Sequence, residues 1–110
     1  MNSQKTGLLG EWRAALFLWR QGMRIVARRY RAAHGEIDLI AREGDALVFI
    51  EVKTRPRGHL LDGARAVNQD KRRHLRQAAE VYLSAHPAES ARFDVIEISA
   101  AGVRHIRNAF

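Results

Sequence analysis

The sequence predicts an α/β domain in which a central mixed sheet of about five strands is flanked by two helices. Three observations predict it: apolar residues at helical spacing near the N-terminus, a hairpin signal in mid-chain, and a second helical stretch between strand-like segments. A strand, a helix and a returning strand form a crossover unit whose two strands run parallel. The expected order is α-β-β-β-α-β-β, within one domain of residues 1–110.

The first helix is expected from about Thr6 to Gln21, because apolar residues recur there at helical spacing and Gly22 stands where a helix would stop. Its predicted buried stripe consists of Leu8, Trp12, Ala15, Leu16 and Trp19. Glu11 falls within that stripe, so its side chain is expected to point toward the sheet. Trp12 and Trp19 are interpreted as core aromatics in preference to base-stacking platforms.

Three strands should follow the first helix. Residues 23–30 suit an edge strand, and residues 36–41 and 46–54 are two further strand-like runs. Gly44-Asp45, between the last two runs, is an acceptable two-residue hairpin loop. The loop length sets the register of this hairpin, and a slip of one residue would turn every side chain to the opposite face.

The second helix should run from about Val67 to Ala85 and end before Pro87, because proline disfavours helix in the residue that precedes it. Its predicted buried stripe consists of Val67, Leu75, Ala78 and Tyr82. Lys71 lies in the same stripe. Three arginines project outward, as phosphate contacts or as a solvated helix face: Arg72, Arg73 and Arg76. Residues 93–99 and 103–107 should form the last two strands.

Charge indicates a polyanionic partner. The chain has 19 Lys and Arg against 12 Asp and Glu, a net charge of +7, and an acidic island at residues 35–52 separates the basic blocks 1–34 and 53–76. Most of the cations are arginine, whose planar fork suits phosphate oxygens, so nucleic acid is favoured over a general solubility charge. The absence of cysteine excludes disulfides, thiolate zinc sites and a cysteine nucleophile, which favours hard, oxygen-binding metals.

No stretch of the sequence has the hydropathy of a membrane segment. Unbroken apolar runs such as Leu47–Ile50 are far shorter than the roughly 20 residues that a membrane span needs, and no signal-type leader is apparent. A cytoplasmic protein without membrane contact is therefore expected.

The candidate chemistry lies on residues 46–54. Strand alternation places Glu51 and Lys53 on one face, where a buried charge is costly unless it is paired or bound to metal. With the Gly44-Asp45 loop, Asp38 lies opposite Glu51, with Cβ atoms about 5 Å apart. Two carboxylates that close repel unless a proton or cation separates them, and oxygen ligands favour Mg²⁺. The alternative is a cross-strand salt-bridge group at a sheet end.

Four segments together resemble the YraN family of small bacterial proteins described as resolvase-like: Gly10-Glu11, Gly35-Glu36-Ile37-Asp38-Leu39-Ile40, Phe49-Ile50-Glu51-Val52-Lys53-Thr54-Arg55 and Ala66-Val67…Lys71. The resemblance extends over nearly the whole chain. The central signature is similar to that of the PD-(D/E)xK nucleases, including Holliday-junction resolvases, and implies a restriction-endonuclease-like fold. In one departure, Ile37 rather than proline precedes Asp38, which that motif tolerates.

The resemblance implies that Asp38 and Glu51 bind Mg²⁺, with Mn²⁺ as the alternative ion, assisted by the backbone carbonyl of Val52. It implies that Glu11 acts through a water or a second ion and that Lys53 orients the attacking water, so the expected catalytic residues are Glu11, Asp38, Glu51 and Lys53. The expected nucleic-acid-binding residues are Arg28, Arg29, Arg31, Arg55, Arg57 and Lys71.

The function expected on these grounds is that of a Mg²⁺-dependent endonuclease-like protein acting on DNA, with branched DNA as the substrate suggested by the resolvases. The resolvases also suggest a homodimer that acts on paired strands. Two alternatives stay open: a nucleic-acid-binding module of the same fold without cleavage activity, and a basic scaffold protein whose acids are structural.

Overall fold

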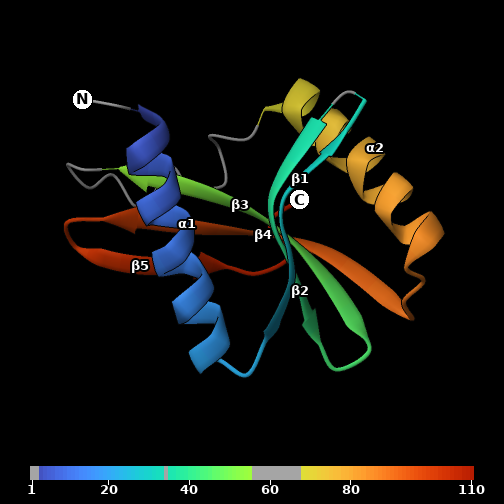
Figure 1. Ribbon diagram of the computed structural model, residues 1–110, viewed down its shortest axis with the longest axis horizontal. Helices are drawn as coiled ribbons and strands as arrows, with labels where there is room; N and C mark the ends of the chain where they lie inside the picture. Colours follow the sequence, from blue (N-terminus) through green and yellow to red (C-terminus); the bar gives the residue numbers. More distant parts are fainter. Residues whose placement is uncertain (1–2, 34, 56–67) are drawn as a thin grey trace.

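The structure, a computed structural model, describes residues 3–33, 35–55 and 68–110 (Figure 1). The elements come in the predicted order: α1 (Ser3–Arg20), β1 (Arg24–Ala32), β2 (Gly35–Glu43), β3 (Ala46–Arg55), α2 (Gln69–Ala85), β4 (Ser90–Ser99) and β5 (Gly102–Ile106). The strands form one sheet of order β1-β2-β3-β4-β5, in which β3 and β4 are parallel and the other neighbours antiparallel. The predicted mixed α/β fold is confirmed. Neither α1 nor α2, as far as they are described, has the length and hydropathy that a membrane crossing requires.

The hairpin of β2 and β3 has the register that the Gly44-Asp45 loop predicts. Leu39 pairs with Ile50 and Arg42 with Leu47, and Gly44 adopts the positive φ of 59° that a tight turn of this kind uses. The Cα pairing extends only to Leu39 and Ile50. The two strands therefore stop pairing one step before Asp38 and Glu51, which leaves room for side chains at that end of the hairpin.

Two apolar cores lie on opposite faces of the sheet. Alternate residues of β3 belong to different cores: Phe49 packs with α2, whereas Ile50 packs with α1. The α2 core includes the helix residues Leu75, Ala78, Ala79 and Tyr82. The predicted α2 stripe is therefore confirmed over its described part, and Val67 lies outside the described residues.

The predicted buried stripe of α1 is wrong. Trp12, Leu16 and Trp19 are 58%, 49% and 67% exposed, and Ala14 and Leu18 face the core in their place. The helix is apolar around most of its circumference, so spacing alone could not select the inward stripe. Ala15 is half-buried, and the side chain of Leu8 is outside those described.

Small residues let α1 approach the sheet closely. A Cβ atom added at Gly10 would lie 2.5 Å from the Thr54 hydroxyl oxygen on β3, so the helix and the strand nearly touch at this point. Glu11 is buried, with 8% of its surface exposed, as the sequence predicts. The close contact brings this carboxylate to the end of β3 that carries the candidate chemistry.

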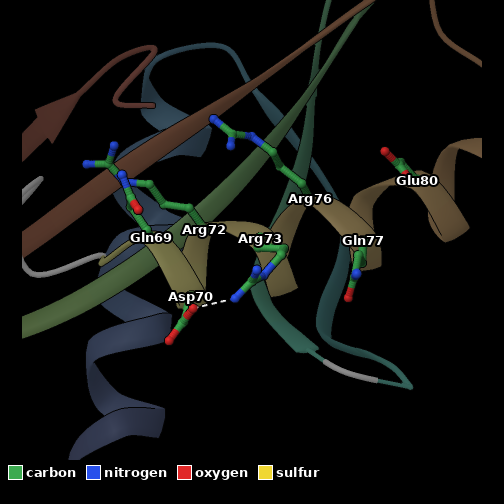
Figure 2. A pocket seen from close by; sticks show the side chains of 7 residues that line it. All are labelled: Gln69, Asp70, Arg72, Arg73, Arg76, Gln77 and Glu80. Carbon is green, nitrogen blue, oxygen red and sulfur yellow. Dashed lines mark hydrogen bonds and ion pairs between the residues drawn. The ribbon is translucent and has the colours of Figure 1, made fainter.

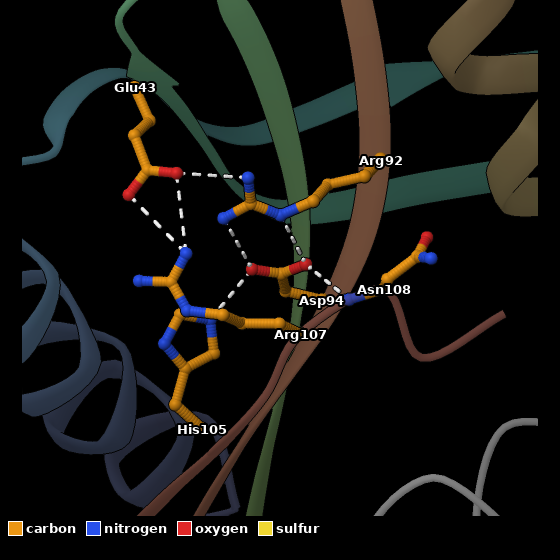
Figure 3. Close-up of polar contacts among 6 residues, drawn as sticks. All are labelled: Glu43, Arg92, Asp94, His105, Arg107 and Asn108. Carbon is orange, nitrogen blue, oxygen red and sulfur yellow. Dashed lines mark hydrogen bonds and ion pairs between the residues drawn. The ribbon is translucent and has the colours of Figure 1, made fainter.

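A polar network ties the other end of the sheet together (Figure 3). Asp94 on β4 is fully buried, accepts two hydrogen bonds from the Arg92 guanidinium at 3.0 and 3.2 Å, and lies 2.6 Å from Nε2 of His105 on β5. The backbone N–H of Asn108 donates to the same carboxylate at 2.9 Å, and Arg92 also donates to Glu43 of β2 at 2.9 Å. The buried carboxylate therefore joins β4, β5 and the C-terminal turn, and Arg92 extends the network to β2.

Gly35, at the start of β2, is expected to be intolerant of a side chain. A Cβ there would lie 2.6 Å from the backbone carbonyl oxygen of His74 on α2, and backbone cannot rotate away as a side chain can. We expect Gly35→Ala to lower the free energy of unfolding by about 1–3 kcal/mol, measured by urea denaturation. Ala33→Ser, at an exposed position nearby, is the control. Equal urea midpoints for the wild type and Gly35→Ala would contradict this close packing.

Candidate active site

A pocket of about 300 Å³ opens between β2, β3 and α2. Its described lining consists of Gly35, Glu36, Asp38, Glu51, Lys71, His74 and Leu75. The two carboxylates that the sequence places opposite each other therefore share one pocket, and a lysine of the second helix lies in the same wall. Glu51 is almost fully buried, at 5% exposure, so its charge needs compensation from neighbours.

Two lysines supply that compensation. The Lys71 Nζ atom lies 2.5 Å from Oε1 of Glu51, and the Lys53 Nζ atom lies 3.3 Å from the same oxygen. Burial and the neighbouring Lys71 ammonium lower the pKa of Lys53. For Lys71, burial opposes the charge, but the contact with Glu51 outweighs it and raises the pKa. Lys53 is therefore the lysine whose proton is more easily lost.

Asp38 is held at the end of β2 by the neighbouring strand. Its Oδ2 atom accepts a hydrogen bond of 2.7 Å from the backbone N–H of Val52. Burial, and after it the negative charge of Glu51, raise the pKa of Asp38 to about 7, although the hydrogen bond from Val52 opposes the shift. In the metal-free protein this carboxyl group therefore exchanges its proton near neutral pH, and a cation in the pocket would compete with that proton.

The raised pKa predicts how Asp38 affects stability. The folded-state pKa lies above the ordinary aspartate value of about 3.9, so the folded protein binds this proton more tightly than the unfolded chain does. Between about pH 4 and pH 7, Asp38 should therefore make the free energy of unfolding fall as pH rises. Urea unfolding of the metal-free protein across this range, with Asp38→Asn alongside, checks it. Identical pH dependence in the two proteins would contradict the expectation.

Glu11 joins the cluster from α1. Its Oε1 atom accepts a hydrogen bond of 3.0 Å from Nε of Arg29, and its charge contributes to the raised pKa of Asp38. Arg29 has a φ of 52°, a left-handed backbone conformation that is uncommon for a residue other than glycine and costs about 1–3 kcal/mol. Arg29 of β1 thus contacts the buried Glu11 of α1 from a strained backbone conformation.

The other predicted phosphate-binding arginines of β1 do not gather into one patch. The Arg28 guanidinium lies over the Trp12 ring, 4.5 Å from its centroid, and Nε of Arg31 lies 3.3 Å from Oε2 of Glu36. Glu36 lines the carboxylate pocket, so Arg31 stands at its rim, whereas Arg28 is attached to α1. Arg57 lies outside the described residues.

A second hollow, of about 720 Å³, runs along the outer surface of α2 (Figure 2). Its described lining shares no residue with the carboxylate pocket and consists of Gln69, Asp70, Arg72, Arg73, Arg76, Gln77 and Glu80. Arg73 pairs with Asp70, and the guanidinium groups of Arg72 and Arg76 lie 5.1 and 5.9 Å from the Phe110 ring centroid. The outward arginines are therefore part of a mixed polar surface.

Comparison with known proteins identifies the family. Residues 10–98 match the family described as "Uncharacterised protein family UPF0102". The chain belongs to the UPF0102 family. This is the YraN family that the sequence motifs resemble, so that prediction is confirmed.

Relatives named UPF0102 protein come from several bacteria. The chain is 43% identical over 110 residues to one from Rhodopseudomonas palustris, covering 96% of this chain and 80% of the relative. It is 36% identical over 118 residues to one from Caldicellulosiruptor saccharolyticus, covering both completely, and 45% identical over 104 residues to one from Chloroflexus aurantiacus, covering 92% and 84%. The UPF0102 match thus includes every described residue of the carboxylate pocket.

A divalent cation in the pocket of this UPF0102 chain would have Asp38 and Glu51 as its carboxylate ligands. Among the described residues no group of three or more His, Cys, Asp or Glu side chains is arranged to hold a metal. One or two carboxylates with water and phosphate completing the shell is the usual arrangement for Mg²⁺, and the raised pKa of Asp38 is what a cation at this point would relieve. The Val52 carbonyl as a further ligand stays a prediction, because the described contact is made by its N–H.

Sequence reasoning missed Glu97 of β4. Glu97 is fully buried and pairs in register with Lys53, and its Oε2 atom lies 3.9 Å from Nε of Arg55. A charged residue within the apolar run of residues 93–98 is the same kind of signal that pointed to Glu51, so it could have been found from the sequence. In this UPF0102 chain, Glu97 lies beside both cations at the end of β3.

Proposed function

We propose that this chain is an endonuclease-like protein that hydrolyses phosphodiester bonds in DNA with the help of Mg²⁺ or Mn²⁺. The observation that carries the proposal is one pocket in which the carboxylates Asp38 and Glu51 meet the amine of Lys71, with the Lys53 amine 3.3 Å from the same Glu51 oxygen. Acidic metal ligands beside an ammonium group are what phosphodiester hydrolysis requires, because the reaction places negative charge on the phosphate and needs an activated water.

Each residue has a role that its position supports. Mg²⁺ held by Asp38 and Glu51 would polarise the phosphate and lower the pKa of a bound water. Lys53, whose pKa is lowered by burial, would orient the attacking water and accept the proton that it loses, while solvent water would supply the proton that the departing sugar oxygen takes up. Lys71 keeps its proton and would stabilise the charge on the phosphate oxygens as the bond to the departing sugar oxygen breaks.

The surface around the pocket supports a DNA backbone as the partner. Arg31 lies at the pocket rim, where it pairs with Glu36, and Arg29 pairs with Glu11 of α1. Arg55 is the last residue of β3, the strand that carries Lys53. Such cations neutralise phosphates and position the strand without reading its sequence. DNA with a branch is the proposed preferred substrate, on the strength of the resolvase-like motif.

A specific contact favours the second candidate, a nucleic-acid-binding module that does not cleave. Both lysines lie on the same oxygen of Glu51, so this carboxylate is already neutralised without an ion. In that case the pocket would be a structural ion-pair cluster, and the positive surface would bind DNA without cleaving it. The two candidates differ in one measurable property, which is ion-dependent cutting.

The test compares cutting and binding of a four-way branched DNA, its linear duplex and its single strands. Each is incubated with the protein in Mg²⁺, in Mn²⁺ or in EDTA, and Asp38→Asn protein purified in the same way reveals any contaminating nuclease. We expect the branched DNA to be cut only when an ion is present. Binding that weakens steeply with salt, without cutting under any condition, would establish the binding module instead.

A further inference from the structure

The outer surface of α1 carries a continuous apolar stripe that the fold leaves uncovered. The stripe consists of Leu9, Trp12, Leu16 and Trp19, which are 61%, 58%, 49% and 67% exposed. Large apolar side chains that are exposed together, and not singly, mark binding surfaces on soluble proteins. The core on the inner side of α1 does not need these residues, because Ala14 and Leu18 fill that position.

The stripe begins beside the carboxylate cluster. Two consecutive residues of β1 contact two consecutive residues of α1: Arg29 binds Glu11, and Arg28 lies over Trp12 with its guanidinium 4.5 Å from the ring centroid. Glu11 follows Gly10, whose backbone closely approaches Thr54 at the end of β3 that carries Lys53. A strand bound along the stripe would therefore have one end next to Glu11, on the α1 face of the sheet.

Among the described exposed residues of α1, the charges beside the stripe are positive. Exposed arginines, Arg13 and Arg20, directly follow the two tryptophans, and the only acid among residues 1–34 is Glu11, which is buried and paired with Arg29. Aromatic side chains interleaved with arginine bind single-stranded nucleic acid, because bases stack on the rings while phosphates meet the cations. Trp12 and Trp19 are seven residues apart, roughly 10 Å along a helix, which about three stacked nucleotides would span.

The same charge pattern disfavours a second copy of the chain as the occupant. Spacings of three and four residues also suit helix–helix packing, so two α1 stripes could in principle face each other. The arginines that flank one stripe would then approach those of the other, and the exposed part of α1 offers no acid to pair with them. Charge complementarity therefore favours a polyanion.

We propose that the α1 stripe is a stacking platform for unpaired DNA bases, with Trp12 and Trp19 as its two stacking residues. This deepens the proposed function and rests on it, because it makes DNA with a single-stranded segment next to the scissile phosphate the preferred substrate. A branch point or a flap supplies such a segment, whereas a continuous duplex does not.

The chain's own tryptophans report on this site. The sequence contains two tryptophans, and both lie on the stripe, so stacked bases should quench the intrinsic fluorescence. Oligothymidine is titrated into the full chain in EDTA, and affinity is measured in parallel by fluorescence anisotropy of a labelled oligothymidine. EDTA prevents any ion-dependent cutting, so failure of the proposed hydrolysis and failure of the stacking site give different results.

We expect oligothymidine to quench the fluorescence and Trp12→Ala and Trp19→Ala each to weaken its binding about tenfold. Trp12→Tyr should retain most of the affinity, because tyrosine can also stack. Val81→Ala, which removes an exposed apolar side chain from α2, is the control and should have no effect. Unchanged fluorescence and affinity would overturn the proposal, and so would a wild-type dimer that Trp12→Ala and Trp19→Ala convert to monomer without a change in affinity.

Discussion

Replacing Asp38 with asparagine should reduce ion-dependent DNA cleavage about 100- to 1,000-fold, the cost of losing one preorganised electrostatic contact in an active site. The substitution keeps the size of the side chain and removes the charge that would hold the cation beside Glu51. Glu51→Gln should have an effect of similar size. DNA binding should persist or strengthen in both variants, because the lost negative charge no longer repels phosphate.

Asp45→Asn is the matched control for these variants. It removes a carboxylate of the same type from the exposed hairpin turn, at the opposite end of β2 and β3. Single-turnover cleavage rates at saturating Mg²⁺ separate chemistry from binding, and anisotropy in EDTA measures binding alone. Near wild-type cleavage by both Asp38→Asn and Glu51→Gln would exclude the proposed mechanism.

Replacing Asp94 with alanine should lower the free energy of unfolding by about 3–5 kcal/mol, the cost of removing one partner of a buried ion pair. Asp94 is fully buried, and the loss would leave the Arg92 guanidinium, His105 and the Asn108 backbone N–H without their shared acceptor (Figure 3). Asp70→Ala, at an exposed pair on α2, should cost at most about 1 kcal/mol. Urea denaturation at neutral pH measures both.

The pH dependence of Asp94 has the opposite sign to that of Asp38. Burial alone would raise the pKa of Asp94, but the hydrogen bonds from His105 and Arg92 outweigh it and lower the pKa below the ordinary aspartate value. Its contribution to stability is therefore fully present above about pH 4 and is lost as pH falls through the folded-state pKa. Acid unfolding of the wild type should be steeper than that of Asp94→Asn. Equal acid transitions would contradict the role of this network.

The sequence specified the hairpin and the carboxylate pocket because both depend on local information. The Gly44-Asp45 loop sets the register of its two strands, and Asp38 and Glu51 follow from it. Lys71 was found in the same way, from its place in the α2 stripe.

The face of α1 that stays exposed and the position of Glu97 relative to Lys53 could not be predicted in this way. An apolar helix has several candidate inward faces, and the close approach at Gly10 that selects one depends on the tertiary structure. The position of Glu97 beside Lys53 depends on the register of two parallel strands, which no turn sets. Contacts between segments distant in the sequence thus determine the inward face of α1 and the register of β3 with β4, which local sequence patterns do not specify.

The parallel contact of β3 with β4 also orders events during synthesis. Lys53 pairs in register with Glu97, so the strand that bears the amine and Glu51 has no partner on that side until β4 has been synthesised. Until then β3 is an open edge, and pairings between segments this distant along the chain form slowly. A chain truncated before β4 should therefore expose this edge of β3 and be prone to aggregate.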